Sequence, residues 1–85
     1  MNDQERAAIA IVCKIIQDAG QPVSRLEITR AIKHKRVMDL SYILGLMLKE
    51  KIIIAKQDST ENSTLVLRYV FAKGFDFDKW KESGN

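Results

Sequence analysis

The side chains with the clearest chemical signal are the basic ones in the middle third of the chain. Residues 21–51 carry seven Lys or Arg and three Asp or Glu, a net charge of +4, whereas residues 1–20 carry −1 and residues 52–85 carry zero. The densest run is Lys33-His34-Lys35-Arg36. A local excess of cations on a small domain attracts a phosphate backbone. A run of only four basic residues is also typical of a solvated turn, so both interpretations stay open.

The remaining composition excludes most kinds of catalytic and metal site. His34 and Cys13 are the only residues of their types, and they lie far apart in the sequence. There is no glycine-rich phosphate loop and no Cys or His pair at metal-ligand spacing. The sequence therefore predicts a protein that is not an enzyme and that has no metal and no cofactor.

The length and the apolar pattern predict one globular domain in a reducing compartment. Eighty-five residues, 46% hydrophobic and 29% charged, are enough for one small core. Unbroken apolar runs such as residues 43–48 are far too short to span a bilayer, so no membrane partner is expected. A single cysteine excludes an internal disulfide and suits the cytoplasm.

Caps and apolar spacing predict a first helix at the start of the chain and a second helix after a short connector. Asn2 and Glu5 match a capping box, and Gly20 is a natural helix end. Pro22 favours an extended connector, and residues 24–27 (SRLE) match a second capping box. The predicted buried sides are Ala8, Ile9, Val12, Ile15, Ile16 and Ala19 in the first helix, and Leu26, Ile28, Ala31 and Ile32 in the second.

The third predicted helix is apolar on more than one side. Asp39 is a good N-cap for it, and the helix runs to about Glu50. Tyr42 and Leu46 fall largely outside its core stripe, so this helix has a second apolar face that another surface is expected to cover. The predicted core stripe is Leu40, Ile43, Leu44, Met47 and Leu48.

Two runs rich in β-branched and aromatic residues predict a β-hairpin. The first strand covers residues 52–55, a polar loop covers residues 57–63 (QDSTENS), and the second strand covers residues 64–72. The extended piece around Val23 is expected to pair with a hairpin strand and to complete a three-stranded sheet.

An aromatic tail of residues 75–85 follows the predicted domain of residues 1–74. The tail holds three of the six aromatic residues, Phe75, Phe77 and Trp80. These side chains either fold back on the core or dock on a partner, and the sequence leaves both open.

The order of elements predicts an α+β fold, a winged helix-turn-helix with three helices followed by a β-hairpin wing. Over about residues 4–72 the chain resembles winged-helix DNA-binding domains. Residues 42–53 (YILGLMLKEKII) are similar to their third helix running into the first wing strand, although that pattern usually has Gly where this chain has Lys51. Residues 69–74 (YVFAKG) resemble the small bacterial regulators of fimbrial operons.

The resemblance implies binding of double-stranded DNA in the cytoplasm, in association with the nucleoid. Third-helix positions that would face the major groove are Met38, Ser41, Tyr42 and Gly45, with Lys49 at the far end. Contacts to the DNA backbone would come from Arg25, Arg30, Lys33, Lys35 and Arg36, with Lys56 and Arg68 near the wing.

The sequence departs from a typical DNA reader in two places. The outward face of the third helix offers almost none of the Arg, Lys, Asn or Gln side chains that read base edges. The loop of residues 57–63 contains Asp58 and Glu61 and no Lys or Arg. Specific binding would therefore need a homodimer, a protein co-regulator or recognition of DNA shape.

Two functions remain as hypotheses. The first is a DNA-binding transcription regulator, which the helix order and the basic middle third favour. The second is a protein–protein interaction module on the same fold, with an interface at Leu46, Phe75, Phe77 and Trp80.

Overall fold

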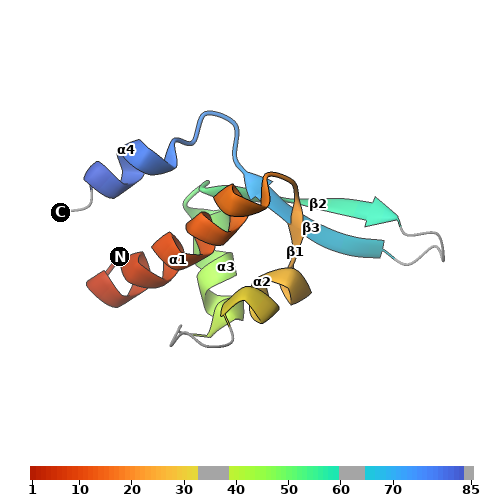
Figure 1. The fold of residues 1–85 in the computed structure, drawn as a ribbon. Helices are drawn as coiled ribbons and strands as arrows, with labels where there is room; N and C mark the ends of the chain where they lie inside the picture. The colour runs from red at the N-terminus through yellow and green to blue at the C-terminus, as the bar shows by residue number, and fades with distance from the viewer. Residues whose placement is uncertain (33–38, 60–64, 84–85) are drawn as a thin grey trace.

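The computed structural model describes residues 1–32, 39–59 and 65–83. Figure 1 shows the helices packed together at one end and a long hairpin projecting from the other. The described elements, in chain order, are α1 (Asp3–Ala19), β1 (Val23–Ser24), α2 (Arg25–Ile32), α3 (Leu40–Lys49), β2 (Ile53–Ser59), β3 (Leu65–Phe71) and α4 (Phe77–Glu82). The predicted basic turn of residues 34–38 lies outside the described residues.

Both predicted capping boxes are confirmed. The Asn2 side chain accepts from the Glu5 backbone N–H at 2.7 Å, and the Glu5 carboxylate accepts from the Asn2 N–H at 2.8 Å. Ser24 and Glu27 make the same reciprocal pair at the start of α2, both at 3.2 Å. Each box satisfies backbone donors that a helix start leaves unpaired, and this fixes where α1 and α2 begin.

The sheet has the order β1-β3-β2, and both pairs are antiparallel. Val23 lies opposite Tyr69, so the predicted pairing of the Val23 segment with the hairpin is confirmed. The predicted first strand is too short, because β2 continues to Ser59 and Gln57 pairs with Leu67. Cross-strand pairing extends the strand into residues whose polar composition predicts a loop.

The core lies between α1, α2, α3 and the inner side of the sheet. Ile9, Ile28, Ile43, Met47 and Ile53 are among its largest fully buried side chains. Cys13, which borders the apolar stripe of α1 in the sequence pattern, is also completely buried.

Several predicted core residues lie at the surface instead. Leu26 is 57% exposed, and Leu48 is 39% exposed. Ala19 and Ala31 are exposed as well. Leu26 and Ala31 lie on α2, which has only eight residues, and its fully or nearly buried positions are Ile28 and Ile32 alone. A helix of about two turns can direct only a narrow stripe at the core, so the wider predicted stripe is wrong.

The segment after β3 folds back on the molecule and forms a further helix, α4. Asp76 caps α4, and Phe77 is buried in the same core cluster as α1 and α3. The Arg6 guanidinium of α1 lies 4.1 Å from the centroid of the Trp80 ring, and it donates to the Trp80 carbonyl at 3.0 Å. Figure 1 shows the start of α1 and α4 at the same end of the molecule.

Lys51 joins α3 to β2 with a φ of 59°. This left-handed backbone conformation favours glycine, so Lys51 bears steric strain at this junction.

Candidate nucleic-acid interface

The outward face of α3 is exposed along its length. Asp39 caps the helix by accepting from the Ser41 N–H at 2.8 Å. Ile43, Leu44 and Met47 point into the core. The opposite face carries Ser41, Tyr42, Gly45 and Lys49, all of them exposed, as the helical spacing predicts.

Arg25 connects the start of α2 to this face. Its guanidinium donates to the Ser41 hydroxyl at 2.5 Å, across 16 residues of sequence. A cation from α2 therefore lies beside the first turn of α3. Both residues are predicted interface residues, but no sequence pattern predicts this contact.

Arg68 of β3 is bonded to α2 instead of standing alone in the sheet. Its guanidinium donates to the Glu27 carboxylate at 2.9 Å. The backbone N–H and the hydroxyl of Ser24, followed by Arg68, hold the pKa of Glu27 below its ordinary value. The Glu27 carboxylate of α2 therefore binds Ser24 of β1 and Arg68 of β3, and its negative charge is paired with the positive charge of Arg68.

Tyr42 is bonded to α1. Its hydroxyl donates to the Glu5 carboxylate, which is only 9% exposed. This donation, with the backbone N–H of Asn2 second, lowers the pKa of Glu5, and the same contact raises the pKa of Tyr42. The ring of Tyr42 is therefore held in one orientation while half of the residue faces solvent. No sequence signal predicts this pairing, since the two residues are 37 positions apart.

The other predicted DNA contacts fall into two groups. Arg30 and Lys56 are exposed on α2 and β2. Lys33, Lys35 and Arg36 lie outside the described residues.

The predicted protein-interface residues are all packed to some degree against this chain's own core. Phe77 is 6% exposed, and Leu46, Phe75 and Trp80 are half-buried against the core cluster. The partly exposed edges of these side chains are what they could offer to a partner.

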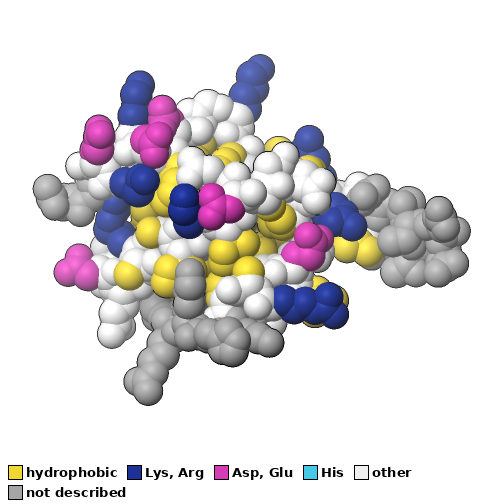
Figure 2. Space-filling view, in the orientation of Figure 1, with side chains coloured by type: hydrophobic (Ala, Val, Ile, Leu, Met, Phe, Trp, Pro, Cys, Tyr) yellow, Lys and Arg dark blue, Asp and Glu magenta, His cyan; other side chains and the backbone are white. Residues whose placement is uncertain are grey.

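Basic and acidic side chains alternate over the face drawn in Figure 2. Dark-blue Lys and Arg side chains flank the base of the hairpin, with an acidic side chain between them. On this face the described cations are dispersed and do not form one dense patch.

An apolar hollow between α2 and β3 was not expected from the sequence. It has a volume of about 580 Å³, and its lining includes Leu26 and Leu67, which are 57% and 47% exposed. Arg25 and Arg68 also line it. The helical spacing directs Leu26 into the core, so only the three-dimensional placement of α2 beside β3 reveals this surface.

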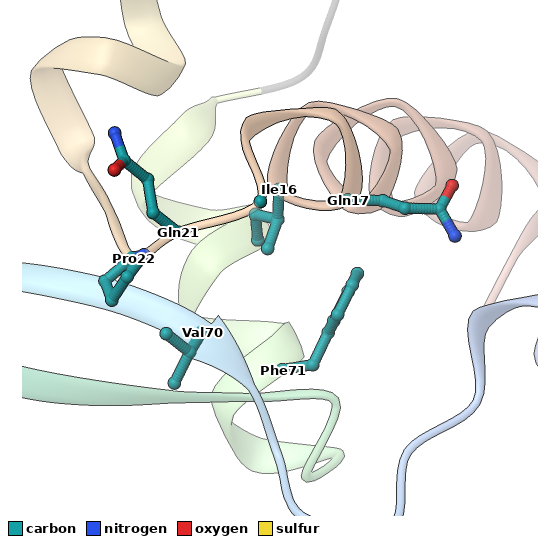
Figure 3. A pocket seen from close by; sticks show the side chains of 7 residues that line it. Ile16, Gln17, Gln21, Pro22, Val70 and Phe71 are labelled. Atoms are coloured by element: carbon teal, nitrogen blue, oxygen red, sulfur yellow. The ribbon is translucent and has the colours of Figure 1, made fainter.

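A second hollow, about 500 Å³, lies between the end of α1 and β3. Figure 3 shows the Phe71 ring extending toward α1, while the amide groups of Gln17 and Gln21 point away from it. Since no polar group of these residues converges on the space, the hollow has no chemistry that would select a polar ligand.

Within the described ranges, no group of three or more His, Cys, Asp or Glu side chains is placed to hold a metal ion. None of the helices there is long and apolar enough to cross a membrane.

A solved structure of similar fold agrees with this architecture. Neither a known protein family nor a curated protein matches the chain. The structure is similar to the X-ray structure of a PadR-like transcription factor from Bacteroides fragilis, with a TM-score of 0.66 over 94% of this chain and 81% of that chain. The chain has a winged-helix fold. The two sequences are 10% identical, so the likeness concerns the fold. In this fold α3 is the third helix, and the hairpin of β2 and β3 is the wing.

Proposed function

We propose that this protein is a DNA-binding transcription regulator that inserts α3 into the major groove and lays its wing along the neighbouring backbone. The observation that carries the proposal is the outward face of α3, which is exposed along its length and has Arg25 of α2 bonded to Ser41 on it. The transcription factor of similar fold supports the proposal, although a fold by itself does not decide function.

The exposed cations around α3 suit contacts to phosphates. Five such contacts would make the logarithm of the binding constant fall with the logarithm of salt concentration with a slope of about −4.5. The described residues in this role are Arg25, Arg30, Lys49 and Lys56, which are exposed, and Arg68, which is half-buried and paired with Glu27. The same proposal extends to Lys33, Lys35 and Arg36.

Sequence specificity would need more than one copy of this surface. The described side chains on the outward face of α3 contain few donors for base edges. We propose that a homodimer on paired half-sites, or a co-regulator, supplies the remaining discrimination in the cytoplasm. A closer relation to regulators of fimbrial operons stays a proposal.

Replacing both Arg25 and Arg30 with alanine should weaken binding to random duplex DNA. Each lost phosphate contact removes about 0.9 from the salt slope, so the double variant should lose about 1.8. Fluorescence anisotropy titrations at about 50 mM and 200 mM salt measure this slope.

A matched control removes two cations elsewhere. Lys14 and Lys81 pair with Asp18 on α1 and Asp78 on α4, and both are well exposed. The double variant Lys14→Ala, Lys81→Ala should keep the wild-type salt slope within error. If the wild-type protein binds no duplex at about 50 mM salt, the proposed function is wrong.

The hollow at Leu26 and Leu67 favours a second candidate function, a protein-interaction module. Exposing two large apolar side chains in one hollow, each more than 40% exposed, is unfavourable and unusual for an isolated small domain. A second copy of the chain that covered them would recover the free energy of burying both.

If this second function holds, the chain should self-associate in sedimentation equilibrium, and the double variant Leu26→Ser, Leu67→Ser should be a monomer. The variant Leu48→Ser is the control, because Leu48 is also exposed but lies on α3 outside this hollow. A wild-type protein that stays monomeric at millimolar concentration would count against self-association through this surface.

A further inference from the structure

The centre of the outward face of α3 is hollow where Gly45 lacks a side chain. A groove of about 330 Å³ lies there, lined by Ser41, Tyr42, Gly45, Leu46 and Lys49. Residues 41, 45 and 49 form one row along the helix, and residues 42 and 46 form the neighbouring row. The missing side chain in the middle of the first row creates the groove.

The fold itself gives no reason for glycine at position 45. A Cβ atom built there meets nothing within 4 Å, and the glycines with positive φ are Gly20 and Gly74. Glycine inside a helix is destabilising relative to alanine because the unfolded chain loses more freedom. The space above Gly45 is therefore kept open at a cost to stability, which points to a group outside the chain.

The walls of the groove are mainly carbon. The Tyr42 ring forms one wall, and its hydroxyl is occupied by Glu5. Leu46 packs against the core and forms another. The Ser41 hydroxyl accepts from Arg25 and keeps its own O–H as a donor, and Lys49 supplies the other side-chain donor. This lining suits a small apolar group and does not suit bidentate hydrogen bonding.

Each end of the groove carries a cation, which suits a polyanionic occupant, and a carboxylate also lies at each end, Asp39 beside Ser41 and Glu50 beside Lys49. Arg25 lies at the Ser41 end, and Lys49 lies at the other. Positions 41 and 49 are eight residues apart, a rise of about 12 Å along α3, so the two cations lie near opposite ends of the helix face that would enter the major groove. There they can contact phosphates while the apolar centre faces base edges.

We propose that the groove at Gly45 receives the C5-methyl group of thymine, so that α3 recognises A·T base pairs by apolar contact. In the major groove this methyl group is the apolar mark that distinguishes thymine from the other bases. The inference rests on the proposed DNA binding and adds the class of base pair that α3 selects.

Duplexes of equal length test the proposal, one with alternating A and T and one with alternating A and deoxyuridine. They differ in the C5-methyl groups alone. Burial of one methyl group should make the thymine duplex bind about fourfold more tightly. Equal binding of both duplexes would overturn the inference and leave DNA binding intact, whereas no binding of either at about 50 mM salt would overturn the proposed function itself.

The variant Gly45→Ala tests whether a preference for thymine comes from the groove at Gly45 or from a difference in shape between the two duplexes. Its methyl group takes the space directly above the helix at position 45, where the thymine methyl group would lie, so the preference for thymine over deoxyuridine should fall to about one. The thermal midpoint should rise by about 3–6 °C, because alanine is the better helix former. A Gly45→Ala variant that keeps the fourfold preference would contradict the proposal. The control is Gln17→Ala, which changes an exposed position of α1 and should keep the wild-type preference.

Discussion

Replacing Phe77 with alanine should lower the free energy of unfolding by about 3 kcal/mol or more. Phe77 is 6% exposed, and its ring lies 6.4 Å from Phe71 and 6.1 Å from Trp80 between centroids. The change removes the buried side chain of α4 and leaves a cavity. For a domain whose total stability is about 5–15 kcal/mol, this is a large fraction, and urea denaturation followed by circular dichroism measures it.

Phe75→Ala is the matched control for Phe77→Ala. The Phe75 ring contacts Phe71 at 5.4 Å between centroids, but the side chain is half-buried, so the cost should be about 1 kcal/mol. Equal losses in the two variants would show that α4 does not pack on the core as described. The same comparison tests whether residues 75–85 are separable from a domain of residues 1–74, because Phe77 lies in the tail and packs into the core of that domain.

The helices and the sheet order follow from local signals in the sequence. Asn2 with Glu5, Ser24 with Glu27 and the Asp39 cap fix three helix starts through contacts within a few residues. The β-branched runs predict the hairpin for a similar local reason. Helix α4 was not predicted although Asp76 caps it, because six residues are too few for a periodic pattern and because Arg6, which packs on Trp80, comes from the other end of the chain.

The candidate interface was only partly predictable. Exposure of Tyr42 and Gly45 follows from the position of the apolar stripe of α3. The bonds from Tyr42 to Glu5 and from Arg25 to Ser41 join different helices, and no spacing rule connects such residues. Exposure of Leu26 was missed because eight residues of α2 give too short a pattern to place its buried side accurately.

These contacts change how the face of α3 would work. The resemblance places Ser41 and Tyr42 at positions that would face the major groove. In the structure, Arg25 and Glu5 engage them, and Gly45 leaves an apolar groove between them. The chemistry available at the centre of the helix is therefore shape and apolar contact, while the cations lie at its ends. Such a surface favours the phosphate backbone for affinity and the thymine methyl group for selection.

The Cys13 thiol should react with iodoacetamide at about pH 8 at least about 1000-fold more slowly in the folded protein than in the unfolded chain. Cys13 is completely buried, and burial raises the pKa of its thiol from 9.0 to about 12. A thiol pKa of about 12 instead of 9.0 lowers the reactive thiolate fraction about 1000-fold at pH values below 9. Mass spectrometry of alkylated protein, with and without denaturant, measures the ratio of rates.

The same shift predicts how stability depends on alkaline pH. Because the thiol pKa is raised in the folded state, the unfolded chain releases this proton first, and the contribution to stability is present below pH 9 and falls as the pH rises toward 12. The free energy of unfolding should therefore decrease relative to that of Cys13→Ala by about 1.5–2 kcal/mol between about pH 9 and 10.5. All other titrating groups are shared by the two proteins, so their contributions cancel in the difference. Parallel stability curves for the two proteins, together with rapid native-state alkylation, would place the thiol at the surface and contradict the packing of α1 against the core.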